Sequence, residues 1–117
     1  MSKVIMFGIK NCDTIEKAKK WLEQNSVEYK FHDYRADGID RAWLATAVKS
    51  LGWEQVLNKR GTTYRQLTDD TKAQMDESLA IDKMLEFPAM IKRPLLSIDG
   101  ELILGFKEQT YQEAFKG

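Results

Sequence analysis

The chain has a single cysteine, Cys12, and its position favours chemistry over packing. It follows an apolar segment, 4–8, that is typical of a buried strand, and it precedes an amphipathic segment that predicts a helix from Asp13. A thiol at such a strand-to-helix turn faces the positive end of the helix dipole, which lowers the pKa of the thiol and increases the fraction of thiolate. Four lysines close in sequence add positive charge: Lys10, Lys17, Lys19 and Lys20. The pattern indicates a nucleophilic thiol.

Two other interpretations of this segment stay open. Free cysteines are often buried and inert, although the polar residues on both sides of Cys12 favour an exposed loop. Asp13 is the predicted N-cap, with Glu16 three residues on as in a capping box. The Asp13 carboxylate would then compete for the amides that stabilise a thiolate.

Length and composition predict one domain, residues 1–117, with a hydrophobic content of 43%. Eighteen acidic and eighteen basic residues cancel, which argues against binding to nucleic acid or to a membrane. The first apolar run is too short for a signal peptide or a membrane span, so a cytoplasmic location is expected. One cysteine without Cys/His spacing predicts neither an internal disulfide nor a metal site, and nothing in the sequence demands a partner copy, so we expect a monomer.

The first third of the chain predicts a strand, a helix and a second strand. The strand at 3–8 is followed by a helix with Ile15, Ala18 and Leu22 on one face, and residues 27–34 alternate apolar and polar as in a strand. A crossover helix of this length predicts that the two strands are parallel.

The rest of the chain predicts a helical block, a hairpin and a last helix. Asp40 and Gly52 bound one helix, Asp69 or Asp70 caps a short one, and another ends before Pro88, with a surface loop at 58–63. The sequence Asp99-Gly100 between apolar runs predicts a hairpin. The last helix, 108–115, directs Tyr111, Ala114 and Phe115 toward the core.

This order of elements predicts an α/β, thioredoxin-like fold. It consists of a mixed four-stranded sheet with a helical insertion, at about 38–88, between the second and third strands. In such a sheet a thiol after the first strand approaches the start of the third, which Arg93 and Pro94 precede. A bond before proline can be cis at modest cost.

Four segments, 8–14, 57–64, 91–95 and 104–107, resemble the arsenate-reductase-related (ArsC/Spx-like) family of the thioredoxin fold, and most of all its small YffB-type members. The resemblance implies a nucleophilic thiolate at Cys12 and a cis proline at Pro94. It also implies cations that stabilise the thiolate or bind an anion. Arg93 matches the family's arginine before the proline, and Arg60 lies in the loop that supplies a second arginine, with Lys10 and Lys107 as further candidates.

The sequence departs from the family pattern at two places. The segment Gly105-Phe106-Lys107 stands where a glutaredoxin-linked arsenate reductase is expected to have a third arginine, and that arginine is missing. Ile15 stands where redox-switch regulators of the Spx type carry a second cysteine. A monothiol needs an external thiol, glutathione or a glutaredoxin, to resolve its mixed disulfide. Carboxylates of glutathione would pair with the cations Arg60, Arg93, Lys10, Lys92 and Lys107.

Three functions follow as hypotheses: a glutathione-linked monothiol reductase with glutathione as co-substrate and no bound cofactor, a glutaredoxin-dependent arsenate reductase, and a non-catalytic Spx-like module that contacts the transcription machinery. A surface arginine is more often solvated than a ligand, so Arg60 and Arg93 rest on the resemblance. His32 is a general base by type, but its strand position favours a structural role. The tryptophans Trp21, Trp43 and Trp53 fit packing, and Lys17, Lys19 and Lys20 fit a solvated helix face.

Overall fold

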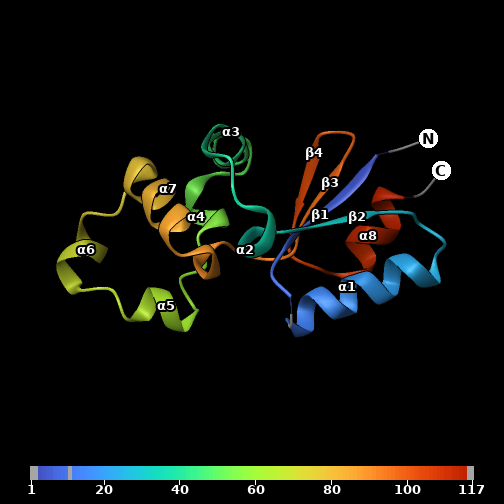
Figure 1. The fold of residues 1–117 in the computed structure, drawn as a ribbon, viewed down its shortest axis with the longest axis horizontal. Coiled ribbons are helices and arrows are strands. Elements are labelled where there is room, and N and C mark those ends of the chain that lie inside the picture. The colour runs from blue at the N-terminus through green and yellow to red at the C-terminus, as the bar shows by residue number, and fades with distance from the viewer. Residues whose placement is uncertain (1–2, 11, 116–117) are drawn as a thin grey trace. The chain divides into compact units, whose positions relative to one another are not determined.

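The computed structural model describes residues 3–10 and 12–115. They form two compact units (Figure 1). The sheet unit comprises Met1–Asp33 and Arg93–Gly117, and the helical unit comprises the contiguous segment Tyr34–Lys92. The helical unit corresponds to the predicted insertion, but it begins at 34 instead of 38 and ends at 92 instead of 88.

The sheet unit contains the predicted mixed four-stranded sheet, in the order β2-β1-β3-β4. β1 is parallel to β2 and antiparallel to β3, and β3 is antiparallel to β4. Both helices of the unit cover the same face of the sheet (Figure 1). The elements are β1 (Val4–Gly8), α1 (Asp13–Gln24), β2 (Lys30–Asp33), β3 (Leu95–Ile98), β4 (Glu101–Leu104) and α8 (Glu108–Ala114).

The core of the sheet unit lies between that face and the two helices. Alternation places Val4 and Met6 of β1 on one side of the sheet, and Leu96 of β3 lies opposite Met6. The helices contribute Ile15, Ala18, Trp21, Leu22 and Tyr111, all of them buried. The predicted helix face is therefore confirmed. Ala114 is exposed, however, so its predicted inward direction is wrong.

The hairpin turn forms as predicted. Asp99 and Gly100 both have positive φ, 51° and 92°, which a two-residue type I′ turn requires. Asp99 also connects the turn to the start of the chain, because its carboxylate accepts from the Lys3 amide at 2.7 Å and its own amide donates to the Lys3 carbonyl at 2.9 Å. The second strand is shorter than predicted, since it begins at Lys30 and ends where Tyr34 starts a helix.

The helical unit consists of short helices around a small apolar core. The two longest, α3 and α7, contribute Leu44, Ala47 and Val48 and Ala80, Ile81 and Met84 to that core. The sequence did not predict three four-residue helices or the 3-10 turn, and the expected loop at 58–63 gives way to a helix at Thr62. The elements are α2 (Tyr34–Asp37), α3 (Arg41–Leu51), α4 (Trp53–Val56), α5 (Thr62–Arg65), α6 (Asp69–Ala73), α7 (Glu77–Glu86) and η1 (Pro88–Met90).

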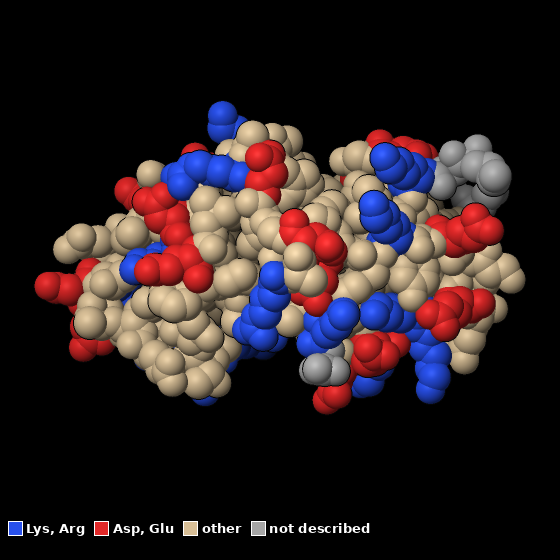
Figure 2. Space-filling model, in the orientation of Figure 1, with Lys and Arg blue, Asp and Glu red and all other residues tan. Residues whose placement is uncertain are grey.

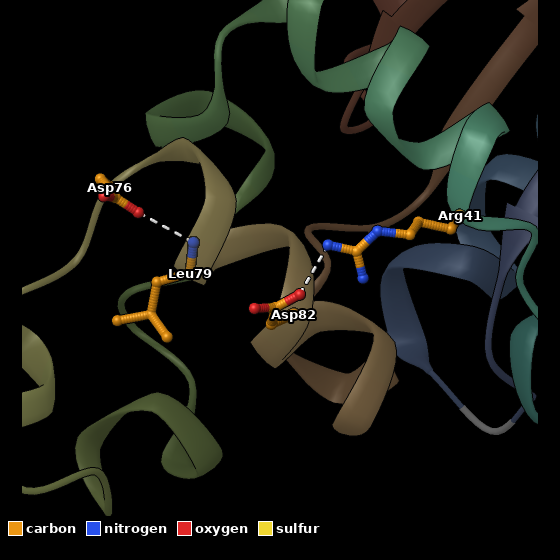
Figure 3. Close-up of polar contacts among 4 residues, drawn as sticks. All are labelled: Arg41, Asp76, Leu79 and Asp82. Carbon is orange, nitrogen blue, oxygen red and sulfur yellow. Dashed lines mark hydrogen bonds and ion pairs between the residues drawn. The ribbon is translucent and has the colours of Figure 1, made fainter.

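Side-chain caps define the starts of three of these helices. Asp40 accepts from the Trp43 amide at the start of α3, and Asp76 accepts from the Leu79 amide at 2.8 Å at the start of α7 (Figure 3). The cap of α6 is Thr68, not the predicted Asp69 or Asp70. Gly52, with φ 90°, ends α3 as predicted.

A single exposed ion pair joins α3 to α7 in Figure 3, between Arg41 and Asp82 at 2.6 Å. Elsewhere, Figure 2 shows basic and acidic side chains interspersed on the visible face of each unit. No helix in the described part of the chain is long and apolar enough to cross a membrane.

Candidate active site around Cys12

Cys12 is the N-cap residue of α1. Its backbone is extended, with φ −111° and ψ 127°, and its carbonyl accepts from the Glu16 amide at 3.0 Å. Asp13 is the first residue of this helix and is exposed, so its carboxylate is not the N-cap. The predicted Asp13 cap is therefore wrong. The physical reason is register: with the cap one residue earlier, the free amides of the first turn face the thiol and not a carboxylate.

These amides act on the half-buried sulfur of Cys12. Partial burial raises the pKa of the Cys12 thiol, but the Ile15 amide, the Arg93 side chain and the Thr14 amide donate hydrogen bonds to the sulfur and lower the pKa. The charge of Arg93 lowers it further, and the net shift is downward. The site therefore holds more thiolate at neutral pH than a free cysteine does.

Arg93 reaches Cys12 because it directly precedes β3, which lies beside β1 in the sheet. The Arg93–Pro94 peptide bond is cis, the form that the resemblance implies. Pro94 is buried, and its carbonyl accepts from the Gly105 amide at 2.8 Å. The start of β3 is thus attached to the end of β4, and Arg93 extends from a fixed strand end.

The other predicted cations of the sheet unit, Lys10 and Lys107, are not among the groups that shift the pKa of Cys12. Lys10 is exposed between β1 and α1, and Lys107 is exposed at the N-cap of α8. Among the described residues, Arg93 is the only charged group that shifts the pKa of the Cys12 thiol. The sequence prediction for Arg93 and Cys12 therefore has a geometric basis, while the roles of Lys10 and Lys107 stay predictions.

Arg60 belongs to the helical unit. It is exposed in the turn after α4, where its amide donates to the Asn58 side chain at 3.2 Å. An open pocket of about 270 Å³ lies at this turn within the helical unit, lined by Glu54, Leu57, Asn58, Lys59, Arg60 and Lys92. An anion-binding role for Arg60 stays a prediction.

The family model described as the ArsC family matches residues 7–114. The chain belongs to the ArsC family. The matched range contains Cys12, Arg93 and Pro94, so the contact between thiol and arginine lies within the family's shared region.

Similar members cover nearly the whole chain. The solved structure of a YffB protein has a TM-score of 0.92 at 47% identity and covers 96% of this chain and 98% of its own. An uncharacterized protein of Haemophilus influenzae is 45% identical, with 96% of this chain and 98% of its own covered. An arsenate reductase (ArsC) related protein from Brucella melitensis has a TM-score of 0.80 at 45% identity, covering 98% and 96%.

Two matches have much lower sequence identity to this chain. A glutaredoxin from Archaeoglobus fulgidus, 14% identical, has a TM-score of 0.51 and covers 100% of this chain and 89% of its own, so the predicted thioredoxin-like α/β fold is confirmed. The Global transcriptional regulator Spx 2 of Bacillus anthracis is 22% identical over 94% of this chain and 85% of its own.

The sequence predicted that amides at the start of the helix can stabilise the thiolate, but it did not identify those of Thr14 and Ile15. Side-chain types at 14 and 15 carry no sign that these two amides meet the sulfur. The only signal was the helix start itself, which the capping interpretation placed one residue too late. The ring of His32, on β2, is tilted by 45° to the Phe7 ring with the centroids 5.1 Å apart, and His32 is half-buried, in keeping with a structural role. The described ranges contain no group of three metal-binding side chains.

Proposed function

We propose that this ArsC-family protein is a glutathione-linked monothiol reductase with Cys12 as its nucleophile. The observation that supports the proposal is the contact of the Cys12 sulfur with the Arg93 side chain and with the amides of Thr14 and Ile15. These three donors favour the thiolate over the thiol, and the thiolate is the form that attacks disulfides.

The reaction has two displacements on sulfur. The Cys12 thiolate attacks the glutathione sulfur of a mixed disulfide, so that a Cys12–glutathione disulfide forms and the substrate leaves as a thiolate. The thiolate of a second glutathione then attacks the glutathione sulfur of that adduct. Oxidised glutathione leaves, and the Cys12 thiolate is restored. The substrate sulfur is reduced from disulfide to thiol, and only the sulfur of the second glutathione is oxidised, from thiol to disulfide. One disulfide is thus exchanged for another, so the electrons balance without a metal or a bound cofactor.

The external thiol follows from the cysteine count. Cys12 is the only cysteine of the chain, so no internal thiol resolves the adduct. Arg93 and the exposed Lys10 and Lys107 are the sheet-unit cations that would attract the two carboxylates of glutathione. A glutaredoxin is the alternative resolving partner. This chemistry suits a reducing compartment, the cytoplasm, and a monomer suffices for it.

A second candidate is a non-catalytic protein-binding module that contacts the transcription machinery. The similarity to Spx 2 over 94% of this chain favours it. Glutaredoxin-dependent arsenate reduction is the weaker alternative within the same chemistry, because Gly105-Phe106-Lys107 stands in place of the third arginine expected of such enzymes and has lysine as its only cation. A lysine has no bidentate fork for an oxyanion.

The deciding experiment follows alkylation of Cys12 by iodoacetamide as a function of pH. We expect the midpoint of the rate to lie below that of free cysteine, and mass spectrometry after incubation with oxidised glutathione to show one adduct that is absent in Cys12→Ser. An ordinary midpoint together with no adduct contradicts the reductase and leaves the binding module. Faster turnover of arsenate than of a glutathionylated peptide, each with glutathione and glutaredoxin, selects the arsenate reductase.

A further inference from the structure

Position 8, the last residue of β1, is occupied by glycine for a reason other than its backbone conformation. The described glycines with positive φ are Gly38, Gly52, Gly100 and Gly105, and Gly8 is not among them. Any L-residue therefore fits the backbone of Gly8. The residue is also buried, and it pairs with Asp33 of β2 inside the sheet. The requirement for glycine must come from the space around its α-carbon.

That space is occupied by Ile15 of α1. A β-carbon on residue 8 would overlap Cδ1 of Ile15, and it would lie 3.3 Å from Cγ1 of Ile15 and 3.7 Å from Cε1 of Phe31. Of the described glycines, Gly8 alone shows such an overlap. The side chain of Ile15 thus rests directly on the backbone of β1, in contact that only glycine permits.

Ile15 has little freedom to move away from an added methyl group. Its side chain is 0% exposed and belongs to the core cluster with Val4, Met6 and Ala18. Its β-branch also restricts χ1 in a helix. An added methyl group at residue 8 must be accommodated either by rotation of Cδ1 about χ2 into the core or by a shift of the first turn of α1. We expect the shift to contribute, because Cγ1 is also close and close-packed interiors transmit strain.

The same residue donates to the nucleophile, because the Ile15 amide bonds to the Cys12 sulfur. One residue therefore has its side chain seated on β1 and its backbone at the thiol. We propose that Gly8 is a positioning residue for Cys12: the missing side chain at the end of β1 seats Ile15 against the strand and holds the Ile15 amide at the sulfur. Gly8 itself touches no reacting atom.

This inference rests on the proposed function, since it concerns the same thiolate. It adds a steric requirement at residue 8 to the electrostatic one at Arg93. The test is a double-mutant cycle of Gly8→Ala and Ile15→Val, since valine lacks the overlapping Cδ1 and keeps the β-branch. The measurements are the pH profile of Cys12 alkylation and the thermal unfolding temperature. Val48→Ala, a buried change in the helical unit, is the control for loss of stability alone.

We expect Gly8→Ala to move the alkylation midpoint upward and to lower the rate near pH 6 by about threefold to tenfold, the change in thiolate fraction for a shift of roughly half a unit to one unit. The double variant is compared with Ile15→Val, and the two should agree within about twofold if Cδ1 carries the effect. Val48→Ala lowers the unfolding temperature and leaves the midpoint in place.

An unchanged alkylation midpoint in Gly8→Ala overturns the inference. The inference is also overturned if Gly8→Ala shifts the midpoint by the same amount in the Ile15→Val background as in the unaltered protein. If Gly8→Ala does not fold, the double variant is the test. A double variant that folds and has the alkylation midpoint of Ile15→Val supports the contact between Ile15 and Gly8 as the cause. A double variant that stays unfolded overturns the inference. Failure of the proposed function is a separate result, an ordinary thiol midpoint in the unaltered protein.

Discussion

The sheet unit and the helical unit contain similar amounts of chain but are specified in different ways. In the sheet unit, alternation along the strands and one apolar helix face already determine which residues meet in the core, as Met6, Leu22 and Leu96 illustrate. In the helical unit most helices are a turn or two long, and individual caps such as Asp40, Thr68 and Asp76 determine where several of them begin. Cys12 therefore belongs to the unit whose core is specified by regular sequence patterns, the alternation along its strands and the apolar face of its helix.

The largest expected effects come from the two cores. Leu22 in the sheet unit and Leu44 in the helical unit are both fully buried, and replacing either with alanine should lower the free energy of unfolding by about 2–5 kcal/mol. With Trp43 and Trp53 changed to phenylalanine, Trp21 fluorescence reports on the sheet unit alone. We expect Leu22→Ala to lower the denaturant midpoint of that signal more than Leu44→Ala does. Equal midpoints would break the comparison, because the two units then unfold as one.

A second test compares an arginine from each unit. Arg93→Ala removes a hydrogen bond and a charge from the Cys12 thiolate, so the pKa of the thiol should rise and alkylation near pH 6 should slow by about tenfold, which corresponds to about 1.4 kcal/mol. Arg93→Lys keeps the charge and should recover part of the rate. Arg41→Ala in the helical unit is the matched control and should leave the pH profile unchanged. Equal profiles for Arg93→Ala and Arg41→Ala would remove Arg93 from the site.

The same contacts make stability depend on pH in a defined direction. Because the pKa of Cys12 is lowered on folding, its contribution to stability is present above the ordinary thiol pKa of about 8.5 and is lost as pH falls through the lowered value. The difference in unfolding free energy between the protein and Cys12→Ser should therefore grow from pH 6 to 9. A difference that shrinks over this range would contradict the lowered pKa.

Tyr111 gives a smaller effect, confined to the sheet unit. Its side chain is fully buried and its hydroxyl has no hydrogen-bond partner in the described part of the chain. Tyr111→Phe should raise the unfolding free energy by about 1 kcal/mol near neutral pH. Burial raises the pKa of Tyr111, so above about pH 10 the phenol ionises in the unfolded chain before it ionises in the folded protein. The protein with Tyr111 therefore loses stability above that pH, and the advantage of phenylalanine should increase there. A loss of stability in Tyr111→Phe at pH 7 would show that the hydroxyl has a partner.

The smallest effects belong to the surface of the helical unit. Asp76→Ala removes the cap of α7 and should cost about 1 kcal/mol, whereas Arg41→Ala breaks an ion pair that is more than half exposed and should cost less, about 0.2–1 kcal/mol. Thermal unfolding in low and high salt separates the two, because salt screens the exposed ion pair more than it weakens the hydrogen bond of the cap. The opposite order of costs would mean that the ion pair stabilises α3 and α7 more than the cap of α7 does.

The sequence predicted the sheet unit nearly in full, for physical reasons that are visible in single residues. Asp99 and Gly100 permit few turn types, and Ile15, Ala18 and Leu22 fall on one face only in a helix. In the helical unit the sequence placed α3 and α7 but missed α4 and α5, whose four residues are too few for a periodic pattern. At the site, the pairing of Cys12 with the segment at 93 followed from strand order. The N-cap at Cys12 and the contact of Ile15 with Gly8 did not follow from strand order, since both depend on backbone register to within one residue.

The sheet unit is assembled from both ends of the chain, and this has a consequence during translation. Arg93 is added to the nascent chain 81 residues after Cys12, and the whole helical unit is synthesised in between. At roughly 5–20 residues per second, this interval lasts roughly 4–16 s. For that time Cys12 lacks its guanidinium partner, one of the groups that lower the pKa of its thiol. The electrostatic contribution of Arg93 to the thiolate is therefore available only after the helical unit has been synthesised.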